Sequence, residues 1–487
     1  MRSEMPLPVA AELAETLELA RPLCVDLDGT LVKSDTLLEE FCQLARKQPW
    51  LLLRVPIWLS RGKANLKIEV GRRAPLDPLQ LPYNLDLLGY LRALRREGQP
   101  IFLTTGADGA TAERVAAHLG LFEDVLASDG ETNLINGHKL NRIQARFAEF
   151  DYIGNSRADL ALLANARQAM VANPTRILRL SLRLRGISVA RTFNDRRPAA
   201  RTLLKAVRVH QWAKNILLLA PLAFSHRITR GSLAAAIAAF FCFSFMASAN
   251  YLINDMLDIE SDRRHPAKRL RPFAAGDFSI ASGLALAAGL FVASAAMLPM
   301  LSRNFAMWLG VYIVSTMAYS MVLKRHAVVD VLLLSGLYTL RLLAGGAATD
   351  TEISPWLAGF STFLFLSLAM VKRFSELENL RERGGAIPHG RGYRVSDMGQ
   401  IRSFGTASAY AAVVVFMLYI ARPDVTALYS HPTRLWLVVP LLLYWLNRVW
   451  LLASRGQLDD DPVVFAVRDR VSLAIGIGVV AVGIFAA

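Results

Sequence analysis

The distribution of apolar residues divides this chain into two parts. Up to about residue 200, apolar and polar positions alternate over short distances, as in an ordinary water-soluble domain. From about residue 213 onward, apolar runs recur at lengths close to the ~20 residues that a membrane-spanning helix needs. The pattern predicts an all-α polytopic membrane domain of nine helices, over residues 214–225, 232–254, 278–300, 304–323, 327–348, 355–372, 403–420, 433–453 and 470–486.

Within the soluble part, strand-like and helical patterns alternate. The segments "PLCVDLDGTLVKSDTL", "QPIFLTTGAD" and "FDYIGNSRADLALL" each carry a short apolar run that is typical of a buried strand. Strands that alternate with helices predict a Rossmann-like α/β domain with a parallel sheet and a site at the carboxyl ends of its strands. We expect this domain to span residues 1–175, a basic linker with an interfacial helix to span 176–212, and the membrane domain to span 213–487.

The charge pattern adds an orientation. The chain has 487 residues and a formal net charge of +15. The loops expected on one side of the membrane hold 18 Lys and Arg residues, and those on the other side hold 5. The positive-inside rule therefore places the first set in the cytoplasm, together with the N-terminal domain, in a multi-pass protein of the inner (plasma) membrane. Because the basic residues lie in loops and in the linker, they indicate a membrane and not nucleic acid as the partner.

Two further features of the sequence argue against a signal peptide and against disulfide or zinc sites. The N-terminal segment has no basic stretch ahead of an apolar core, so we expect no signal peptide. Cys24, Cys42 and Cys242 are too scattered for a disulfide framework or a zinc site.

Asp26 and Asp28 are the first candidates for chemistry. They lie two positions apart at the end of the first expected strand, so both side chains project from the same side. Two carboxylates this close repel each other unless a cation lies between them. One of them can attack a phosphorus atom while the other handles the proton of the leaving group. The alternative for "DLDGT" is a plain polar turn.

Further motifs resemble the haloacid dehalogenase (HAD) superfamily of phosphatases over residues 20–175. The resemblance implies that Asp26 is the nucleophile, that Asp28 is the acid/base and that both contact Mg²⁺. It also implies a phosphate-binding hydroxyl at Thr105 or its neighbour Thr104, a phosphate-binding Lys139, and Asp159 in "GNSRAD" as a metal partner. The sequence departs from the pattern at Asn155, where many members have aspartate. An amide can offer an oxygen to a metal, but without charge.

The apolar stretch "WLLLRVPIWLS", residues 50–60, falls where such phosphatases carry a small helical cap. One interpretation is that this stretch forms the core of the cap. The other is that the cap leans on the bilayer, with Trp50 and Trp58 at the level of the headgroups.

A second candidate site lies in "NDMLDIESDRRHPAKRLRPFAAG", residues 254–276, between two apolar runs. Asn254, Asp255, Asp258 and Asp262 recur every three or four positions, which predicts one shared helical face. Oxygen ligands at a membrane edge suggest Mg²⁺, which binds a few carboxylates together with substrate phosphates. Lys268, Arg269 and Arg271 would then face the remaining phosphate charge. A merely solvated charged loop is the alternative.

This stretch resembles the first aspartate-rich motif of the UbiA superfamily of intramembrane prenyltransferases, and the resemblance covers residues 205–487. Members of that family ionise a carbon–diphosphate bond with Mg²⁺. The second half departs from the usual pattern, because "YSMVLKRHAVVDVLLLSGLYTLRLLAGG" offers Asp330 alone where a second acidic cluster is common. An arginine within a span, Arg341, is costly to insert, by about 2.5–3.5 kcal/mol, so we expect it to face the substrate cavity or to pair with a neighbouring helix.

"RVHQWAKN", "MVKRFSELENLRERG" and "LDDDPVVFAVRDR" resemble the decaprenyl-phosphate phosphoribosyltransferase branch of that superfamily. The branch uses 5-phosphoribosyl 1-diphosphate as donor and a polyprenyl phosphate as acceptor, so the donor brings an additional 5-phosphate. The substrate-binding candidates that this implies in the second half are Lys214, Tyr319, Lys324, Asp330, Arg341, Lys372, Arg373 and Glu376.

We therefore expect a Mg²⁺-dependent enzyme of cell-wall precursor biosynthesis. It would move 5-phosphoribose onto a polyprenyl (decaprenyl) phosphate, and its soluble domain would dephosphorylate the product. One alternative is a prenyltransferase that acts on an aromatic or other small acceptor. Another is a non-catalytic lipid-binding scaffold, against which the intact set of aspartates argues. The sequence is compatible with a homo-oligomer and leaves the prenyl length open.

Overall fold

The computed structural model describes all residues except 1–20, 130–132, 226–227, 383–391 and 459–460, so most of the N-terminal segment on which the signal-peptide expectation rests lies outside the described residues. The chain forms two compact units. The first unit comprises Met1–Ala206 and Leu252–Ala285, and the second comprises Val207–Tyr251 and Leu286–Ala487. The aspartate-rich stretch therefore belongs to the same unit as the N-terminal domain.

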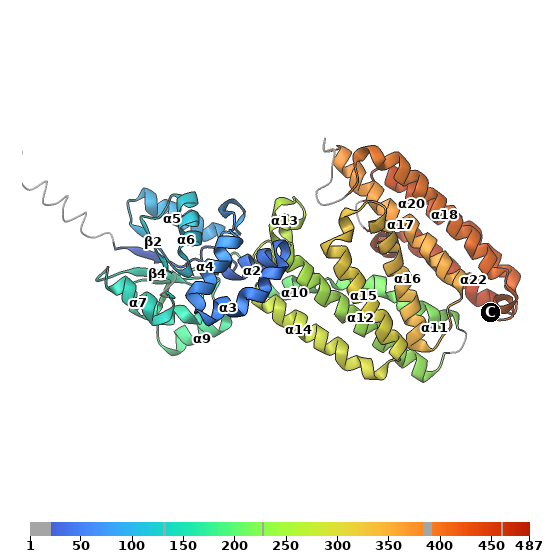
Figure 1. The fold of residues 1–487 in the computed structure, drawn as a ribbon, viewed down its shortest axis with the longest axis horizontal. Helices are drawn as coiled ribbons and strands as arrows, with labels where there is room; N and C mark the ends of the chain where they lie inside the picture. The colour runs from blue at the N-terminus through green and yellow to red at the C-terminus, as the bar shows by residue number, and fades with distance from the viewer. Residues whose placement is uncertain (1–20, 130–132, 226–227, 383–391, 459–460) are drawn as a thin grey trace, which may run out of the picture. The chain divides into compact units, whose positions relative to one another are not determined.

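A six-stranded parallel sheet forms the centre of the first unit, in the order β3-β2-β1-β4-β5-β6 (Figure 1). The strands are β1 (Leu23–Val25), β2 (Ile101–Asp108), β3 (Asp124–Ser128), β4 (Asp151–Gly154), β5 (Ala169–Ala172) and β6 (Val189–Phe193). β1 pairs with β2 on one side and with β4 on the other, so the direction of strand addition reverses at β1. The carboxyl end of β1 is thus the topological switch point, where open α/β sheets bind their ligands. The expected Rossmann-like fold is confirmed.

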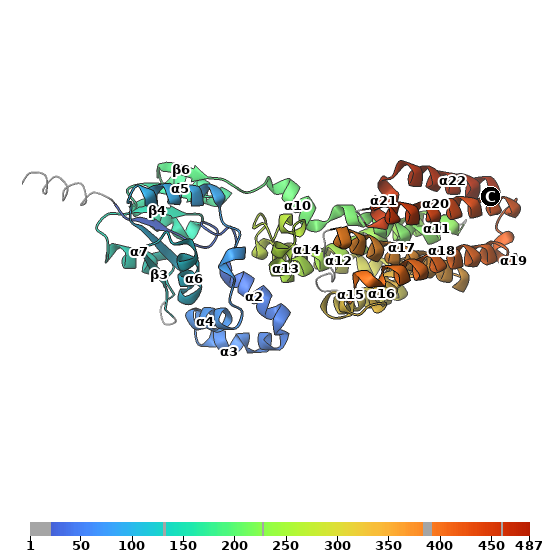
Figure 2. The ribbon, with the colours of Figure 1, turned by 90° about the horizontal axis from the view of Figure 1, so that it is seen from above.

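Helices cover both faces of this sheet (Figure 2). Because side chains alternate along β1, Leu23 and Val25 point to one face and Cys24 to the other. The first face packs against α5 (Leu85–Arg96) and α6 (Gly109–Leu119). The opposite face packs against α7 (Asn136–Gln144), α8 (Leu160–Asn165) and α9 (Arg176–Leu184).

The expected linker over residues 176–212 is wrong in its first half. Leu178 and Leu182 of α9 are buried against the sheet, and β6 pairs with β5 in parallel. The amphipathic pattern of α9, with Arg between the leucines, indicates a surface helix of a folded domain as readily as a basic linker. The α/β fold therefore extends to Phe193.

A small helical cap lies between β1 and β2, as the resemblance implied. It consists of α2 (Thr36–Lys47), η1 (Pro49–Arg54), α3 (Val55–Ser60) and α4 (Lys63–Arg73). Trp58 is only 4% exposed in the core of the cap, beneath the guanidinium of Arg73, whereas Trp50 is 65% exposed. The two interpretations of residues 50–60 thus apply to different side chains, and Trp58 cannot lie at the headgroups.

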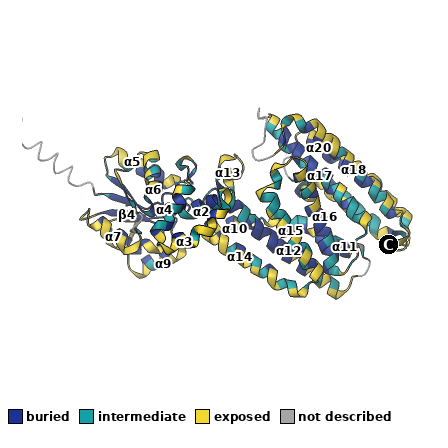
Figure 3. Cartoon of the chain, in the orientation of Figure 1, coloured by how far each residue is buried: buried dark blue, intermediate teal, exposed yellow. Residues whose placement is uncertain are grey.

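Long apolar helices make up most of the second unit. They are α15 (Arg303–Met321), α16 (Val329–Thr349), α17 (Pro355–Glu382), α18 (Met398–Ile420), α20 (Val438–Ser454) and α22 (Arg470–Ala486), with α12 (Arg230–Leu257) and α14 (Ile280–Met297) each shared with the first unit. Buried residues line α16 and α17, whereas α14 is exposed along most of its length (Figure 3).

The prediction of nine spans is not confirmed. Within the described part of the chain, six helices are long and apolar enough to cross a membrane, and a seventh span results if α21 (Pro462–Arg468) and α22, bent by 81°, count as one. Residues 214–225 form a 3₁₀ helix, η4 (Val209–Leu219), and a five-residue α11 (Ala220–Phe224), which is too short to span. The expected helix at 304–323 exists as α15, but its polar residues keep it outside the candidate spans.

Candidate active sites

The first candidate site lies at the carboxyl end of β1. Lys139, on α7, donates a 2.6 Å hydrogen bond to Oδ1 of Asp26, and the hydroxyl of Thr30 donates a 3.1 Å bond to Oδ2. Asp26 and Lys139 are both buried. The fold therefore joins two predicted residues that are 113 positions apart in the sequence. Thr30 was missed, although its place in "DLDGT" is the signal that could have found it.

Asp28 is held by the cap. The backbone N–H of Thr36, the first residue of α2, donates a 2.8 Å bond to Oδ1 of Asp28. Burial, and then the charge of Asp35, raises the pKa of Asp28 to about 8. Burial, opposed by Lys139, raises the pKa of Asp26 to about 6. Of the two carboxyls, Asp28 is thus the better suited to carry a proton to a leaving group.

Two threonines of β2 were alternative phosphate ligands. The hydroxyl of Thr104 points to the carbonyl of Val25 at 3.4 Å, which ties β2 to β1. The oxygen of Thr105 accepts a 3.0 Å bond from the N–H of Ala107, two residues further along the same strand, and its own proton is left to donate. This geometry favours Thr105.

Both carboxylate oxygens of Asp159 accept hydrogen bonds from nearby residues of the same segment. Its Oδ1 accepts a 2.8 Å bond from the hydroxyl of Tyr152, and its Oδ2 accepts bonds from the N–H of Asn155 and from both the N–H and the hydroxyl of Ser156. Lys139 lies 3.8 Å away. These contacts favour a role in anchoring the loop and orienting Lys139, in place of the metal contact that the resemblance implied.

Asn155 lies closer to the aspartate turn. Gly29 has a φ of +76°, and a Cβ built there would be 2.0 Å from Nδ2 of Asn155, so only glycine allows this approach. The donor set of Asp26, Asp28 and the Asn155 amide consists of oxygen ligands that Mg²⁺ accepts. Burial raises the pKa of both aspartates, and a cation between them would offset that cost and favour their charged forms, so the residues fit the metal.

The second candidate site is in the aspartate-rich stretch of the first unit. Nη1 of Arg271 lies 2.7 Å from Oδ2 of Asp262 and 3.2 Å from Oδ1 of Asp255. Both carboxylates are buried, whereas Arg271 is partly exposed. Burial raises the pKa of Asp262, and Arg271 opposes that shift. The structure thus brings three predicted residues together.

The prediction of one continuous helical face is wrong. α12 ends at Leu257, Asp258 is the N-cap of α13 (Ile259–Arg264), and Asp258 forms an ion pair with Arg46 of the cap. Asn254 accepts the N–H of Asp258 through its backbone carbonyl. In the described ranges, no group of three or more His, Cys, Asp or Glu side chains is arranged to hold a metal. The pair of Asp255 and Asp262 still fits Mg²⁺, which commonly takes only one or two protein carboxylates and completes its shell with substrate phosphates.

Two other basic residues of this stretch lie further out. Lys268 and Arg269 belong to η5 (Lys268–Leu270) and are exposed. Of the three predicted phosphate-facing cations, Arg271 contacts both buried carboxylates, and the charge of Lys268 also acts on Asp262.

In the second unit, Arg373 and Asp330 form an ion pair inside the helix bundle. Nε of Arg373 lies 2.5 Å from Oδ2 of Asp330, and the same guanidinium contacts Glu376 and the hydroxyl of Tyr319, the latter at 3.2 Å. Tyr393, which sequence reasoning missed, donates a 2.6 Å bond to Oδ1 of Asp330. Four predicted residues thus form one network.

Asp461 forms ion pairs with two lysines. It lies 2.7 Å from Nζ of Lys214 and 2.9 Å from Nζ of Lys372, and the hydroxyl of Tyr338 approaches at 3.4 Å. These residues line a cavity of about 50 Å³. Asp461 was missed, although an aspartate directly before Pro462 is a typical N-cap, and it does cap α21 through the N–H of Val463.

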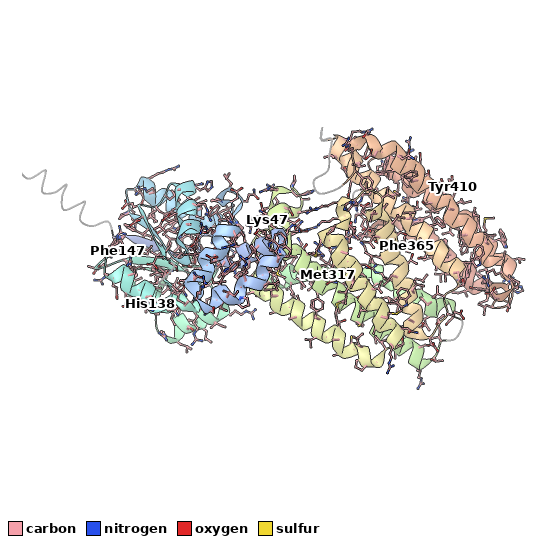
Figure 4. The ribbon with its side chains drawn as sticks, viewed as in Figure 1. Lys47, His138, Phe147, Met317, Phe365 and Tyr410 are labelled. Atoms are coloured by element: carbon pink, nitrogen blue, oxygen red, sulfur yellow. The ribbon has the colours of Figure 1, made fainter. Side chains whose placement is uncertain are left out.

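Arg341 has the neighbour-pairing role that the sequence left open. Its Nε donates a 2.9 Å bond to Oδ1 of Asn215, and its guanidinium carbon lies 5.1–5.5 Å from the ring centroids of Phe243, Tyr312 and Tyr338. Phe365, labelled in Figure 4, lies on α17, and its ring stacks on that of Tyr338 with centroids 4.5 Å apart. Lys324 lies in η7 (Leu323–Arg325) and is partly exposed.

Comparisons with known proteins agree with this division of the chain. Residues 216–473 match the UbiA prenyltransferase family, and residues 23–164 match the haloacid dehalogenase-like hydrolases. The protein y4nM of Sinorhizobium fredii is 37% identical over 461 residues, which cover 93% of this chain and 89% of that protein.

Two shorter relatives match the membrane part. Nodulation protein NoeC of Azorhizobium caulinodans is 33% identical over 57% of this chain and 90% of its own length. The decaprenyl-phosphate phosphoribosyltransferase of Mycobacterium tuberculosis is 35% identical over 55% of this chain and 88% of its own length.

Solved structures are more distant. A UbiA homologue from Archaeoglobus fulgidus, bound to GPP and Mg²⁺, aligns with 57% of this chain and 99% of its own at a TM-score of 0.44 and 15% identity. A homologue from Aeropyrum pernix in the apo form aligns with 56% and 98% at a TM-score of 0.41 and 18% identity. From the extent of the family match and of the full-length relative, this chain belongs to the UbiA prenyltransferase family and carries a haloacid dehalogenase-like domain at its N-terminal end.

Proposed function

We propose that the chain transfers 5-phosphoribose from 5-phosphoribosyl 1-diphosphate to a polyprenyl phosphate and releases diphosphate. The observation that carries this proposal is the pair of buried carboxylates, Asp255 and Asp262, that share Arg271 at the end of an apolar helix. A Mg²⁺–diphosphate requires such carboxylates for the metal and a cation for the oxygens that the metal leaves uncovered. The relatives named decaprenyl-phosphate phosphoribosyltransferase support this choice of donor and acceptor.

In this reaction, the bond between C1 of the ribose and the diphosphate oxygen breaks, and an oxygen of the lipid phosphate forms a new bond to C1. Bound Mg²⁺ would withdraw charge from the diphosphate and make it a better leaving group. Asp255 and Asp262 would hold the cation. Arg271, the common partner of both carboxylates, supplies positive charge for the departing diphosphate.

The 5-phosphate of the donor needs cations of its own. Lys214 and Lys372 are the leading candidates, because they line a cavity and share a single carboxylate, Asp461, that a phosphate could replace. Arg373 and Arg341 are already engaged with protein acceptors. The geometry therefore favours these two arginines as supports and the two lysines as phosphate ligands.

The HAD-like domain then removes the 5-phosphate of the lipid product. A carboxylate oxygen of Asp26 attacks phosphorus, the sugar oxygen leaves, and Asp28 gives that oxygen a proton. Water hydrolyses the aspartyl phosphate, returning a proton to Asp28 and releasing inorganic phosphate. Lys139 offsets the charge of the phosphoryl group beside Asp26.

The distribution of basic residues supports a location in the inner (plasma) membrane. The excess of Lys and Arg on one set of loops favours a cytoplasmic position for those loops and for the HAD-like domain. Both soluble substrates, the ribosyl donor and water for the hydrolysis, are available on that side.

The test uses purified full-length protein in detergent with Mg²⁺, labelled 5-phosphoribosyl 1-diphosphate and polyprenyl phosphate. We expect lipid-soluble label, and little transfer from a ribosyl diphosphate that lacks the 5-phosphate. A parallel reaction contains a prenyl diphosphate and 4-hydroxybenzoate. Efficient prenylation of that aromatic acceptor, without incorporation of phosphoribose into lipid, would replace the proposal with a prenyltransferase function.

A further inference from the structure

The cap of the HAD-like domain is attached to the aspartate-rich stretch within the first unit. Helix α2 of the cap contributes Glu39, Gln43, Arg46 and Lys47, and the stretch contributes Asp258, Glu260 and Arg263 as their partners. Lys47, the last residue of α2 (Figure 4), lies 3.0 Å from Oε2 of Glu260 on α13. Apolar residues accompany these contacts, with Leu76 and Leu81 of the cap segment and Met256 and Leu257 of the stretch lining one small cavity of about 30 Å³. A space of this size holds only a few water molecules, so the surfaces are closely fitted.

Arg263 is the central residue of this interface. Its Nη1 donates a 2.8 Å hydrogen bond to Oε2 of Glu39, and its Nη2 donates a 2.5 Å bond to Oε1. The two side chains therefore make a two-point contact. The side chains of Arg263 and Glu39 are 8% and 2% exposed. Nε of Arg263 donates a 2.9 Å bond to the carbonyl of Ala274. The guanidinium of Arg263 therefore links three segments, which are α2 of the cap, α13 of the stretch and the later part of the stretch around Ala274.

The contacts of Arg263 involve residues next to the carboxylates and the cation that we assign to the metal–diphosphate. Asp262 directly precedes Arg263 in the chain. Arg271, which contacts Asp255 and Asp262, lies three residues before Ala274, and its carbonyl accepts the N–H of Ala275. Arg263 thus adjoins Asp262 in the chain and is bonded to the segment that follows Arg271.

A second attachment lies at the end of the stretch. Gly276 has a φ of +71°, and a Cβ built there would be 2.8 Å from Cβ of Lys33 and 3.1 Å from Pro82. Lys33 and Arg197 both approach Asp277, at 3.9 and 3.4 Å. The stretch is therefore held by the HAD-like domain along its length, and not at one residue.

We propose that Glu39 and Arg263 are positioning residues of the transferase site, so that the HAD-like domain serves as a support for the diphosphate-binding stretch in addition to any hydrolysis of its own. This inference rests on the proposed transferase function of that stretch. Carboxylates that bind a metal and a reacting diphosphate must be held to within a fraction of an ångström. Helix α2 supplies a folded element to which ion pairs hold the stretch at Asp258, Glu260 and Arg263.

The experiment compares Glu39→Gln, Arg263→Lys and the double variant with the wild-type chain. Glu39→Gln keeps the shape but leaves the guanidinium without its charged partner. We expect the KM for the donor and the Mg²⁺ concentration for half-maximal rate to rise together, by about 10-fold or more and up to about 10²-fold. Arg263→Lys keeps the charge without the two-point contact, so its effect should be intermediate. The effects of the two single changes should not add in the double variant, because both remove one contact.

Arg264→Lys is the matched control. Arg264 is adjacent to Arg263 and is 56% exposed, and it pairs with Glu260 of the same stretch. Since exposed ion pairs contribute little, we expect this variant to stay within about twofold of the wild type.

A second readout does not depend on turnover. Trypsin can cleave the stretch after Arg263, Arg264, Lys268 and Arg269, and Glu39→Gln leaves all of those sites in place. We expect faster cleavage in Glu39→Gln, and weaker protection when Mg²⁺ and inorganic diphosphate are added. If wild-type protein transfers no phosphoribose at all, the proposed function fails while the trypsin comparison still tests the positioning role. Wild-type cleavage and protection in Glu39→Gln, or an unchanged KM in an active enzyme, would overturn the inference.

Discussion

Arg373 and Asp330 neutralise each other inside the membrane unit, where Nε of the arginine lies 2.5 Å from Oδ2 of the aspartate and their side chains are 2% and 0% exposed. In the sequence they were separate candidates. Asp330 stood alone where a second acidic cluster is common, and Arg373 was a possible cation for a phosphate. Their pairing means that removing either one leaves a buried charge without its partner.

We therefore expect Asp330→Ala to destabilise the protein by about 3–5 kcal/mol. The measurement is thermal unfolding in detergent. Asp424→Ala is the matched control, since Asp424 forms an exposed pair with Arg422, and it should leave the melting temperature nearly unchanged. Equal effects of the two changes would show that the buried pair has no special structural role.

Asp255→Ala should lower phosphoribosyl transfer by about 10²–10³-fold, because it removes one of the two buried carboxylates that we assign to the metal. Excess chelator should have a comparable effect on the wild type. The size-exclusion profile and melting temperature of the variant report whether it is folded. Wild-type turnover in Asp255→Ala, or in the presence of chelator, contradicts the assignment.

Asp26→Asn should abolish phosphate release by removing the nucleophile, while transfer to lipid continues. The lipid product should then accumulate with its 5-phosphate, which mass spectrometry of the extracted lipid detects. The isosteric amide keeps the surroundings of Lys139 and Thr30 in place. If the lipid is dephosphorylated as completely as by the wild type, the HAD-like domain has been given the wrong role.

Exposed apolar side chains of the cap offer a test of lipid contact. Leu53 is 82% exposed and Ile57 55% exposed, next to Trp50. Changing Leu53 and Ile57 together to aspartate should lower hydrolysis of the lipid-linked phosphate by roughly tenfold or more, since two apolar side chains would no longer enter the headgroup region. Hydrolysis of soluble p-nitrophenyl phosphate should not change. A parallel loss for both substrates would indicate damage to the cap itself.

Glu40 makes the stability of the first unit depend on pH. Burial raises the pKa of this carboxyl to about 8, although the hydroxyl of Thr111 donates a bond to it, and Asp108 adds to the rise while Arg114 opposes it. The folded state thus binds a proton that the unfolded state releases, and this group's contribution to stability falls as pH rises from about 4.5 to about 8. Glu40→Gln should melt on the order of several degrees higher than the wild type at pH 9 and close to it at pH 5. The same difference at both pH values would rule out titration of Glu40 as the cause.

Local patterns in the sequence determined the division of the chain and much of its chemistry. The alternation of strands and helices predicted the parallel sheet, and the apolar runs predicted most of the membrane helices, because both follow from the side chains of neighbouring residues. The spacing of Asp26 and Asp28, and the resemblance of the segment around Lys139, were enough to select side chains that the fold brings to the carboxyl end of β1. β6 and the true extent of this domain were missed, since an edge strand that is mostly exposed carries little periodic signal.

The tertiary structure decided which charges meet. Helix α12 ends before Asp258, so Asp258 does not continue the helical face of Asp255. Asp258 pairs instead with Arg46, which is 212 residues away in the sequence. Asp461 gathers Lys214 and Lys372 from two distant helices, and Glu39 holds Arg263 across a contact between the cap and the aspartate-rich stretch. A charge in a sequence has many candidate partners, and the energy of a pair depends on burial and on distances of a few ångströms. Those quantities exist only once the chain has folded.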